Sequence, residues 1–434
     1  MAMIRPETEM KDSGVQWIGD IPTSWTIFPA NGVFSEVKEK NTDLKFTNAF
    51  SFKYGEIVDK KQVGDVDNNL KETLSSYTIV RKNTIMINGL NLNYDFISQR
   101  VAIVNESGVI TSAYLAIQPD ENKINPRFVL YLLKSYDYQQ VFHGLGSGIR
   151  KTLKYQDFKK IMIVAPTLSE QQAIADYLDE TCSKIDEIIA EAKASIDEYK
   201  ELKQSVIFEA VTKGLNKNVN VYKTENIWIP LLPVGVNLSR FGLHHDIILG
   251  KMLCPNPRNE EDTLEPYYCA ANVHFDGVTG ELKTMWFNPK EKETYAVHKN
   301  DMLIVEGGAG AGGAAIMNEE PPVSTFVQNS IMIVRSHMKD NRYSCYLVQA
   351  LVKNKYVDVV CNKATIPHFT KEKVSYIPYP VFDRNQQCMI ADYLDEKCKQ
   401  IDSLIAEKES LINDLEAYKK SLIYEVVTGK RRVV

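Results

Sequence analysis

One helical stretch is written twice in this chain. Residues 171–191 read QQAIADYLDETCSKIDEIIAE, and residues 386–407 read QQCMIADYLDEKCKQIDSLIAE. Aligned on IADYLDE, the copies stay in step without a gap from Ile174 to Thr212 and from Ile390 to Thr428. The offset of 216 residues is about half of the 434-residue chain. Because repeats decide architecture before any single motif does, the sequence predicts a duplicated fold.

In both copies the apolar residues recur at intervals of three and four, which is typical of one stripe along an amphipathic helix. Ser169 with the acid and amides that follow it predicts a helix start, while Gly214 and Gly429 predict helix ends. A helix of about 40 residues, about 60 Å long, is not stable alone, so we expect each stripe to be buried against the other copy. The expected contact residues are Ile174, Leu178, Ile185, Ile189, Ile196, Ile390, Leu394, Ile401, Ile405 and Leu415. The carboxylates of IADYLDE are expected to face solvent or a partner: Asp176, Asp179, Glu180, Asp392, Asp395 and Glu396.

The segments before each long helix are rich in β-branched and aromatic residues and in turn signals, which predicts strands. Each segment also has one helix late on, then a basic loop, a strand and a proline. The predicted class is α+β, with two α/β globular domains and two long helices in an antiparallel coiled coil of approximate two-fold symmetry. Strands are expected near residues 84, 100, 113, 161, 302, 314, 330 and 374, and the late helices at 126–141 and 342–359. The expected boundaries are 1–168 and 215–382 for the globular domains, and 169–214 and 383–434 for the helices.

Composition is that of an ordinary soluble globular protein, with 44% hydrophobic and 25% charged residues. The seven scattered cysteines and the polar start MAMIRPETEMKDSG predict a protein of the reducing cytoplasm with no membrane partner. Charge is segregated: the two long helices together carry −10, so the rest of the chain carries +5 of the total of −5. The acidic total therefore does not exclude a polyanionic partner.

Three polar segments are candidates for contact with such a partner, and an ordinary solvated loop is the alternative for each. In GLGSGIRKTLKYQDFKK (144–160) glycines let the backbone approach phosphates and cations supply charge. NGLNLNYDFISQR (88–100) offers amides and a guanidinium of the kinds that pair with adenine and guanine. NKATIPHFTKEK (362–373) is the less basic counterpart of the first segment. The candidates are Gly146, Ser147, Arg150, Lys151, Lys154, Asn91, Asn93, Gln99, Arg100, Lys363, His368, Thr370 and Lys371.

Motifs for chemistry are missing. EGGAGAGGAAIM (306–317) lacks the GK[ST] of a phosphate loop and precedes a strand-like segment, which favours a tight turn between strands. His244, His245 and Asp246 have no second ligand cluster, so no metal site is predicted. No methyltransferase tetrad or nuclease motif is found. We therefore expect no catalytic residue and no cofactor bound by this chain.

Several stretches together make the chain resemble the specificity subunit of type I restriction–modification enzymes. They are DSGVQWIGDIPTSW (12–25), EQQAIADYLD after a proline, NQQCMIADYLD, SVIFEAVTKG and SLIYEVVTGK. The resemblance spans essentially the whole chain, although TENIWIPLLPVGVN (224–237) lacks the GDIP-x-x-W spelling at the second domain's start.

The resemblance implies two target-recognition domains that each read one part of a split sequence in double-stranded DNA. It also implies a coiled coil that docks two methyltransferase subunits, with two motor-nuclease subunits joining them, and no catalysis by this chain. S-adenosylmethionine, ATP and Mg²⁺ are then expected on the partner subunits. A methyltransferase or nuclease acting alone, and a coiled-coil adaptor with no DNA role, are the alternatives from other classes.

Overall fold

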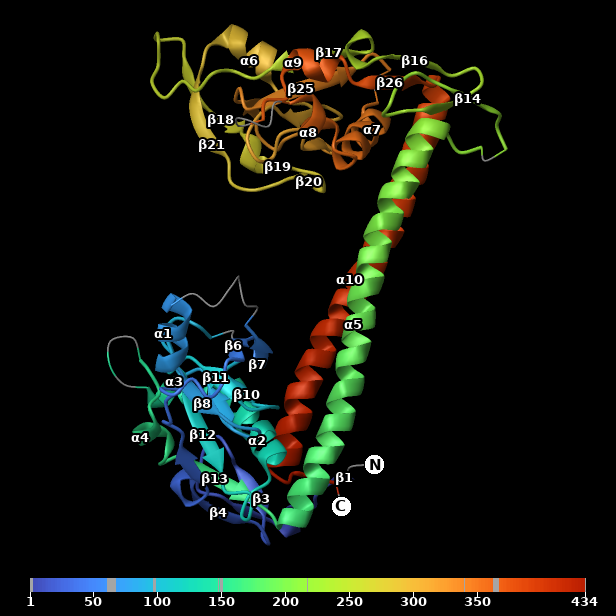
Figure 1. Cartoon of the computed structure of the whole chain (residues 1–434). Helices are drawn as coiled ribbons and strands as arrows, with labels where there is room; N and C mark the ends of the chain where they lie inside the picture. The colour runs from blue at the N-terminus through green and yellow to red at the C-terminus, as the bar shows by residue number, and fades with distance from the viewer. Residues whose placement is uncertain are drawn as a thin grey trace. The chain divides into compact units, whose positions relative to one another are not determined.

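Each copy of the repeat forms one uninterrupted helix in the computed structural model (Figure 1): α5 spans Leu168–Lys213 and α10 spans Arg384–Val427. The structure describes residues 3–60, 68–96, 99–146, 148, 151–216, 218–338, 340–361 and 367–433. The chain divides into two compact units. Unit 1 comprises Met1–Lys193 and Glu409–Val434, and unit 2 comprises Ala194–Lys408, so each unit holds one part of each long helix.

Unit 1 is built on two four-stranded sheets, with strand orders β10-β9-β12-β5 and β7-β6-β11-β8. The central strand β9 is buried along its whole length, which explains its unbroken apolar run. The strands are β1 Met3–Ile4, β2 Met10–Asp12, β3 Asp20–Pro22, β4 Thr26–Pro29, β5 Phe34–Glu36, β6 Ala49–Lys53, β7 Glu56–Asp59, β8 Thr78–Val80, β9 Ile85–Ile87, β10 Val101–Ile103, β11 Gly108–Ile110, β12 Leu115–Pro119, β13 Met162–Ala165 and β27 Arg431–Arg432. The shorter helices are α1 Asn68–Ser76, α2 Pro126–Tyr138, α3 Val141–Leu145 and α4 Tyr155–Phe158.

Unit 2 repeats this plan, with sheets ordered β23-β22-β25-β17 and β21-β18-β24. Its strands are β14 Val221–Lys223, β15 Leu231–Pro233, β16 Asn237–Arg240, β17 His245–Leu249, β18 Thr263–Tyr268, β19 Val273–His274, β20 Gly277–Val278, β21 Lys283–Phe287, β22 Met302–Val305, β23 Ala314–Ile316, β24 Phe326–Val327, β25 Ile331–Ser336 and β26 Pro378–Val381. Its shorter helices are α6 Pro289–Tyr295, α7 Arg342–Lys353, α8 Tyr356–Val360 and α9 Lys371–Ser375. The predicted strand near residue 374 is therefore corrected: that segment first forms α9, and the strand starts at Pro378.

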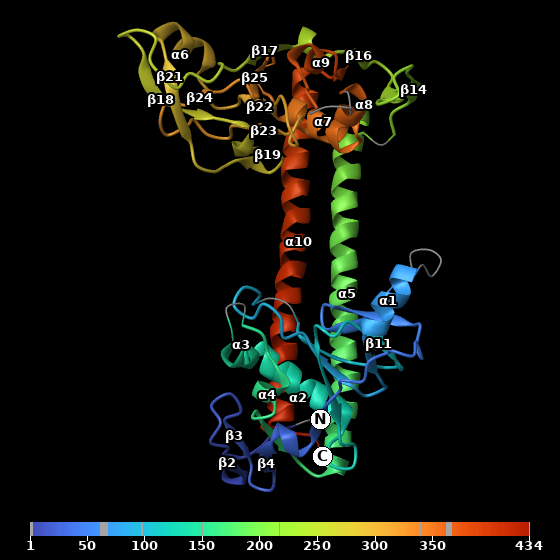
Figure 2. The same cartoon turned by 60° about the vertical axis from the view of Figure 1, so that its left-hand side comes forward.

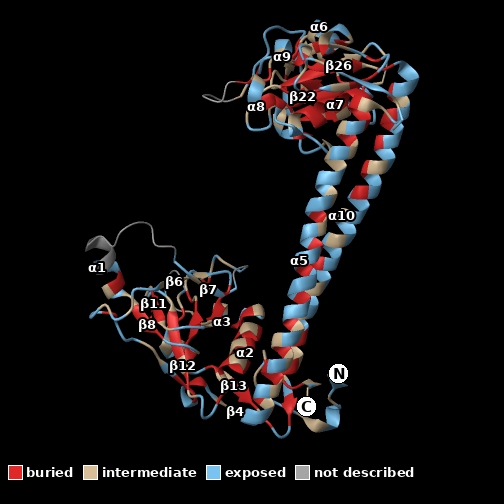
Figure 3. Ribbon diagram, turned by 45° about the vertical axis from the view of Figure 1, so that its right-hand side comes forward, coloured by how far each residue is buried: buried red, intermediate tan, exposed pale blue. Residues whose placement is uncertain are grey.

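The long helices run antiparallel inside each unit. In unit 1, Asp186 of α5 forms an ion pair with Lys419 of α10 at 2.6 Å. The start of α5 lies beside the end of α10, because Arg5 donates both to Glu170 and to the carbonyl of Gly429, the second residue after α10. In unit 2 the last turns of α5 pack against the first turns of α10 in one apolar cluster. Figure 3 shows the buried stripe on each helix. Eight of the ten expected contact residues are buried, whereas Ile405 and Leu415 are half-buried.

Paired aspartates of IADYLDE join each globular part to its long helix. Arg127 at the start of α2 binds Asp176 and Asp179 of α5, and the hydroxyl of Tyr131 donates to Asp179 at 2.8 Å. Figure 2 shows α2 beside the long helices. In unit 2, Arg342 and Tyr346 of α7 make the same contacts with Asp392 and Asp395 of α10. Asp176, Asp392 and Asp395 are exposed to solvent, as expected, and Asp179 is half-exposed; in addition, all four fix the globular part to the helix.

Asn125 begins α2 as its N-cap, accepting hydrogen bonds from the backbone N–H groups of Arg127 and Phe128, and Pro126 occupies the first turn. This cap sets the position of Arg127. None of the described helices has both the length and the apolar composition needed to cross a bilayer.

Candidate nucleic-acid interface

Two of the candidate segments lie against each other in unit 1. The loop 88–100 joins β9 to β10, and it is bonded at two points to the backbone of residues 151–153. Leu92 N–H donates to the Lys151 carbonyl at 3.1 Å, and Leu153 N–H donates to the Gly89 carbonyl at 2.9 Å. A Cβ at Gly89 would stand 2.8 Å from Leu153 Cβ, so this approach requires glycine. Residues far apart in the sequence thus form one continuous surface.

Arg100 is fully buried, with 0% of its surface exposed. Its guanidinium donates to the backbone carbonyls of Asn88, Leu90 and Asp95 at 2.9, 2.9 and 2.5 Å, while its own N–H donates to the Asp137 carboxylate at 2.7 Å. Burial raises the pKa of Asp137 to about 6. The role expected for Arg100 is therefore corrected: it holds the loop 88–96 closed, and its guanidinium has no access to a base edge.

The remaining candidates of unit 1 differ in exposure. Asn91 is exposed, with a left-handed φ of 53° that starts a turn closed by Tyr94 N–H. Gln99, Lys151 and Lys154 are exposed as well, and Lys154 directly precedes α4. Their side chains are thus presented to solvent, as contact with DNA requires.

Two others are packed into the surface. Asn93 is half-buried, and a Cβ at Gly146 would stand 2.7 Å from Leu92 Cδ1, so Gly146 lets the loop 144–154 approach Leu92. Ser147 and Arg150 lie outside the described residues.

Exposed aromatic side chains on this surface were missed by the sequence reasoning. Tyr54, Tyr94 and Phe96 are 87%, 73% and 55% exposed. Phe96 stacks on His143 with ring centroids 5.0 Å apart, and His143 bonds the Asp95 carbonyl through Nε2. Aromatic rings beside cationic and amide groups are suited to stacking on bases or wedging between base steps. The available signal was NYDF itself, where two aromatics stand between turn-forming residues.

Unit 2 carries its counterpart surface at the same place in the frame. The glycine turn 306–313 joins β22 to β23, which confirms the predicted turn between strands. Phe369 N–H donates to the Glu306 carbonyl at 2.6 Å, as Leu153 does to Gly89 in unit 1, and His368 Nδ1 lies 3.2 Å from the Glu306 carboxylate. Thr370 stands at the N-cap position of α9 and Lys371 is exposed. Lys363 lies outside the described residues.

His245 has a structural environment. Its Nδ1 bonds the Phe241 carbonyl at 2.9 Å, its Nε2 bonds Ser344 Oγ at 2.8 Å, and its ring stacks on Phe241 at 3.7 Å. Burial lowers the pKa of His245 to about 4, so the ring is neutral at pH 7. Within the described part of the chain, no three His, Cys, Asp or Glu side chains are grouped to hold a metal ion.

Known proteins share both the sequence pattern and the fold. The family described as the type I restriction modification DNA specificity domain matches residues 22–198. The MjaX type I restriction enzyme specificity subunit of Methanocaldococcus jannaschii is 22% identical, over 96% of both chains. A chain solved in work on complex assembly and conformational transition of the type I R-M system aligns with a TM-score of 0.72 at 14% identity, over 94% of this chain and 98% of that one. The HsdS subunit from Thermoanaerobacter tengcongensis aligns over the same shares, with a TM-score of 0.54 at 15% identity. The chain thus matches the type I DNA specificity domain over residues 22–198, is similar over nearly its whole length to a type I specificity subunit, and shares the fold of an HsdS subunit.

Proposed function

We propose that this chain is the DNA-reading subunit of a type I restriction–modification complex. Each globular part reads one half of an asymmetric bipartite target, and the long helices set the spacing between the halves. The chain performs no catalysis of its own. The observation that carries the proposal is the repeated frame: two units hold two unlike loops, 88–100 and 306–313, at equivalent positions.

Contact with DNA is supported by the groups on these loops. In unit 1, Lys151 and Lys154 supply positive charge beside the amides of Asn91 and Gln99. Cations on phosphates provide affinity that depends on salt, whereas amides at base edges provide sequence preference. In unit 2 the glycine turn allows the backbone to come close to a phosphate, and Lys371 supplies charge nearby. The two surfaces differ in chemistry, which fits two different half-sites.

Docking of partner subunits on the long helices is supported by their exposed apolar side chains. These are Ile188, Leu411 and Tyr418 in unit 1, and Leu202 and Leu404 in unit 2. Ile188 and Leu404 occupy equivalent positions of the repeat, as do Leu202 and Tyr418. Equivalent apolar positions suit two copies of one partner. We therefore infer two methyltransferase subunits on the helices, with two motor-nuclease subunits joining them, and S-adenosylmethionine, ATP and Mg²⁺ bound by those partners.

The test is the target itself. The chain is expressed with its partner subunits, and methylated adenines in the host DNA are mapped by sequencing. One discrete bipartite sequence is expected, and its absence would refute the proposal. Replacing Asn91 and Gln99 by alanine should relax one half of that sequence and leave the other half unchanged.

The cationic contribution has its own readout. The double variant Lys151→Glu, Lys154→Glu should weaken DNA binding by the assembled complex about equally for all sequences and lower the dependence on salt. Lys82→Glu, on the turn between β8 and β9, reverses one exposed charge of the same unit and is the control, and each single variant, Lys151→Glu or Lys154→Glu, is matched to it in charge. Unchanged affinity and salt dependence in the double variant would favour a coiled-coil adaptor with no DNA role.

A further inference from the structure

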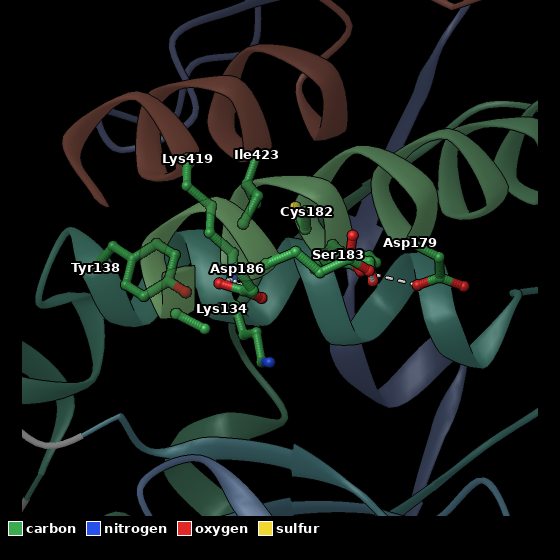
Figure 4. Close-up of a pocket in the computed structure, with 11 residues that line it drawn as sticks. Lys134, Tyr138, Asp179, Cys182, Ser183, Asp186, Lys419 and Ile423 are labelled. Atoms are coloured by element: carbon green, nitrogen blue, oxygen red, sulfur yellow. Dashed lines mark hydrogen bonds and ion pairs between the residues drawn. The ribbon is translucent and has the colours of Figure 1, made fainter. Parts of the chain in front are cut away.

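A groove in unit 1 lies between α2 and the long helices. Figure 4 shows Lys134 and Tyr138 extending from α2, Cys182 and Asp186 from α5, and Lys419 and Ile423 from α10. Its volume is about 490 Å³ and it is open to solvent. Asp186 is occupied by its ion pair with Lys419, and Asp179 at the groove's end is occupied by Arg127 and Tyr131. These two carboxylates are therefore already paired, whereas Glu187 in the same wall accepts a hydrogen bond from Ser183 Oγ at 3.3 Å.

Lys134 differs from these groups. It is partly buried, and no hydrogen bond or ion pair joins its ammonium to any other residue that the structure describes. Burial lowers the pKa of Lys134, and the positive charge of Lys419 acts in the same direction, while the negative charges of Glu56 and Asp186 oppose the shift. Burying an ammonium that has no hydrogen-bond acceptor costs free energy. An oxygen atom offered to Lys134 by another molecule would therefore be bound favourably.

Unit 2 shows how the equivalent positions are covered. Arg342 and Tyr346 of α7 stand 215 residues after Arg127 and Tyr131 and make the same contacts, so the same offset matches Gln349 to Lys134 and Lys353 to Tyr138. Gln349 Nε2 donates to the backbone carbonyl of Phe275 at 2.9 Å. Lys353 Nζ lies 4.8 Å from the centroid of the Phe275 ring. One residue of the chain's own loop thus supplies both an acceptor and an aromatic ring.

The difference arises from one connection between two strands. In unit 2, residues 269–282 connect β18 to β21 and contain the β19–β20 hairpin with Phe275. In unit 1 the equivalent strands β6 and β7 are joined by Tyr54 and Gly55 alone. The equivalence follows from the strand pairing. In unit 1, β6 pairs in parallel with β11 and antiparallel with β7, and in unit 2, β18 pairs in parallel with β24 and antiparallel with β21. The short turn of unit 1 makes no hydrogen bond to Lys134 among the described residues; Glu56 directly after it acts on Lys134 through its charge alone, and Lys420 Nζ of α10 lies 5.8 Å from the centroid of the Tyr138 ring.

We propose that the groove of unit 1 is a docking site for a loop of the modification subunit, which offers a carbonyl or carboxylate oxygen to Lys134 and an aromatic ring to Tyr138. The inference rests on the proposed function for the identity of that partner. It goes further in assigning a docking position that exists in only one of the two repeated units. Two copies of one partner would then bind this chain in two unequal steps.

The test uses the full-length chain and the purified modification subunit without DNA. Stepwise dissociation constants are measured by isothermal titration calorimetry and sedimentation velocity for the wild type, Lys134→Glu and the charge-matched control Lys82→Glu. Lys134→Glu puts an acceptor where a donor is needed, so one of the two steps should weaken at least tenfold while the other stays within twofold. Lys82→Glu should change neither step.

Several results would overturn the inference. They are binding of the Lys134→Glu chain within twofold of wild type at both steps, equal weakening of both steps, and no binding of the modification subunit by the wild type. If Lys134→Glu does not fold, Lys134→Met keeps the side-chain stem and should weaken one step at least threefold. Failure of the proposed function is separable: a wild-type complex that forms in two steps but methylates no discrete sequence refutes DNA reading and leaves the docking result valid.

Discussion

Replacing Arg100 by methionine should open the loop 88–96 while the rest of unit 1 stays folded. Methionine keeps much of the volume of the side-chain stem but leaves the carbonyls of Asn88 and Leu90 without their donor, while the Asp95 carbonyl keeps its bond with His143 Nε2. A hydrogen bond to a charged group contributes about 1.5–3 kcal/mol. Because Asp95 is half-exposed and keeps His143, the cost arises mainly at the other two carbonyls, and we expect a local cost of about 3–5 kcal/mol.

Hydrogen exchange measures this opening directly. The backbone N–H groups of Leu92, Tyr94 and Asp95 are bonded in the closed loop and should lose protection in Arg100→Met. Because the binding-competent conformation is then a minor population, the assembled complex should bind its target at least tenfold more weakly, without a change in the preferred bases. Gln99→Ala, an exposed change in the same loop, is the control and should keep full protection. If Arg100→Met kept the loop protected and instead relaxed one base of the target, Arg100 would be reading that base and the reasoning from burial would be refuted.

Three further predictions concern stability. Lys203→Glu breaks the half-exposed ion pair with Asp402 at 2.7 Å and should lower the free energy of unfolding by about 0.5–1 kcal/mol. Adding Asp402→Lys should recover most of this loss. If the effects of the two substitutions were strictly additive, the ion pair would contribute nothing to stability. The unfolded chain binds a proton at His245 below about pH 6.5, whereas the folded chain does so only near pH 4, so the free energy of unfolding should fall as the pH is lowered through this window, by up to about 3 kcal/mol. Urea unfolding between pH 7 and 4.5 measures that slope, which should be flatter in His245→Gln; equal slopes would contradict the buried neutral ring. In the absence of partners, Lys134→Met should raise the free energy of unfolding by about 1 kcal/mol, because it removes a partly buried charge. Lys82→Met should leave the free energy of unfolding unchanged. Calorimetric melting measures both, and no gain for Lys134→Met would show that burial of the ammonium is not costly.

The duplicated frame was predictable because its signals are local or periodic. The apolar stripes, the glycine ends of the long helices and the runs of β-branched residues each act over a few turns or one strand. The segment after Phe369 was not predictable in this way. Residues 371–375 form one helical turn before Pro378 begins a strand paired with β16, and so short a helix is decided by its packing against the sheet.

The candidate site was predictable as a set of loops but not in the roles of its residues. Arg100 looked like a base reader because arginine pairs with guanine, yet its role depends on three carbonyls that come together only when the loop closes. The ion pair of Asp176 with the globular part was not predictable, because its partner Arg127 lies 49 residues earlier in the sequence. Contacts of this kind follow from tertiary packing, which no periodicity encodes.

The frame around each reading loop has a consequence for how such proteins can acquire new targets. Between the ends of the flanking strands, unit 1 accommodates thirteen residues (88–100) and unit 2 eight (306–313), and both loops are bonded to the chain at the same neighbouring segment. The frame thus tolerates loops that differ in length and in chemistry. The loop can therefore be exchanged by protein engineering under two conditions. A glycine, or another residue that allows close approach, must accept the bond that Gly89 accepts from Leu153. In the longer loop, Arg100 or an equivalent buried donor must bond the loop carbonyls.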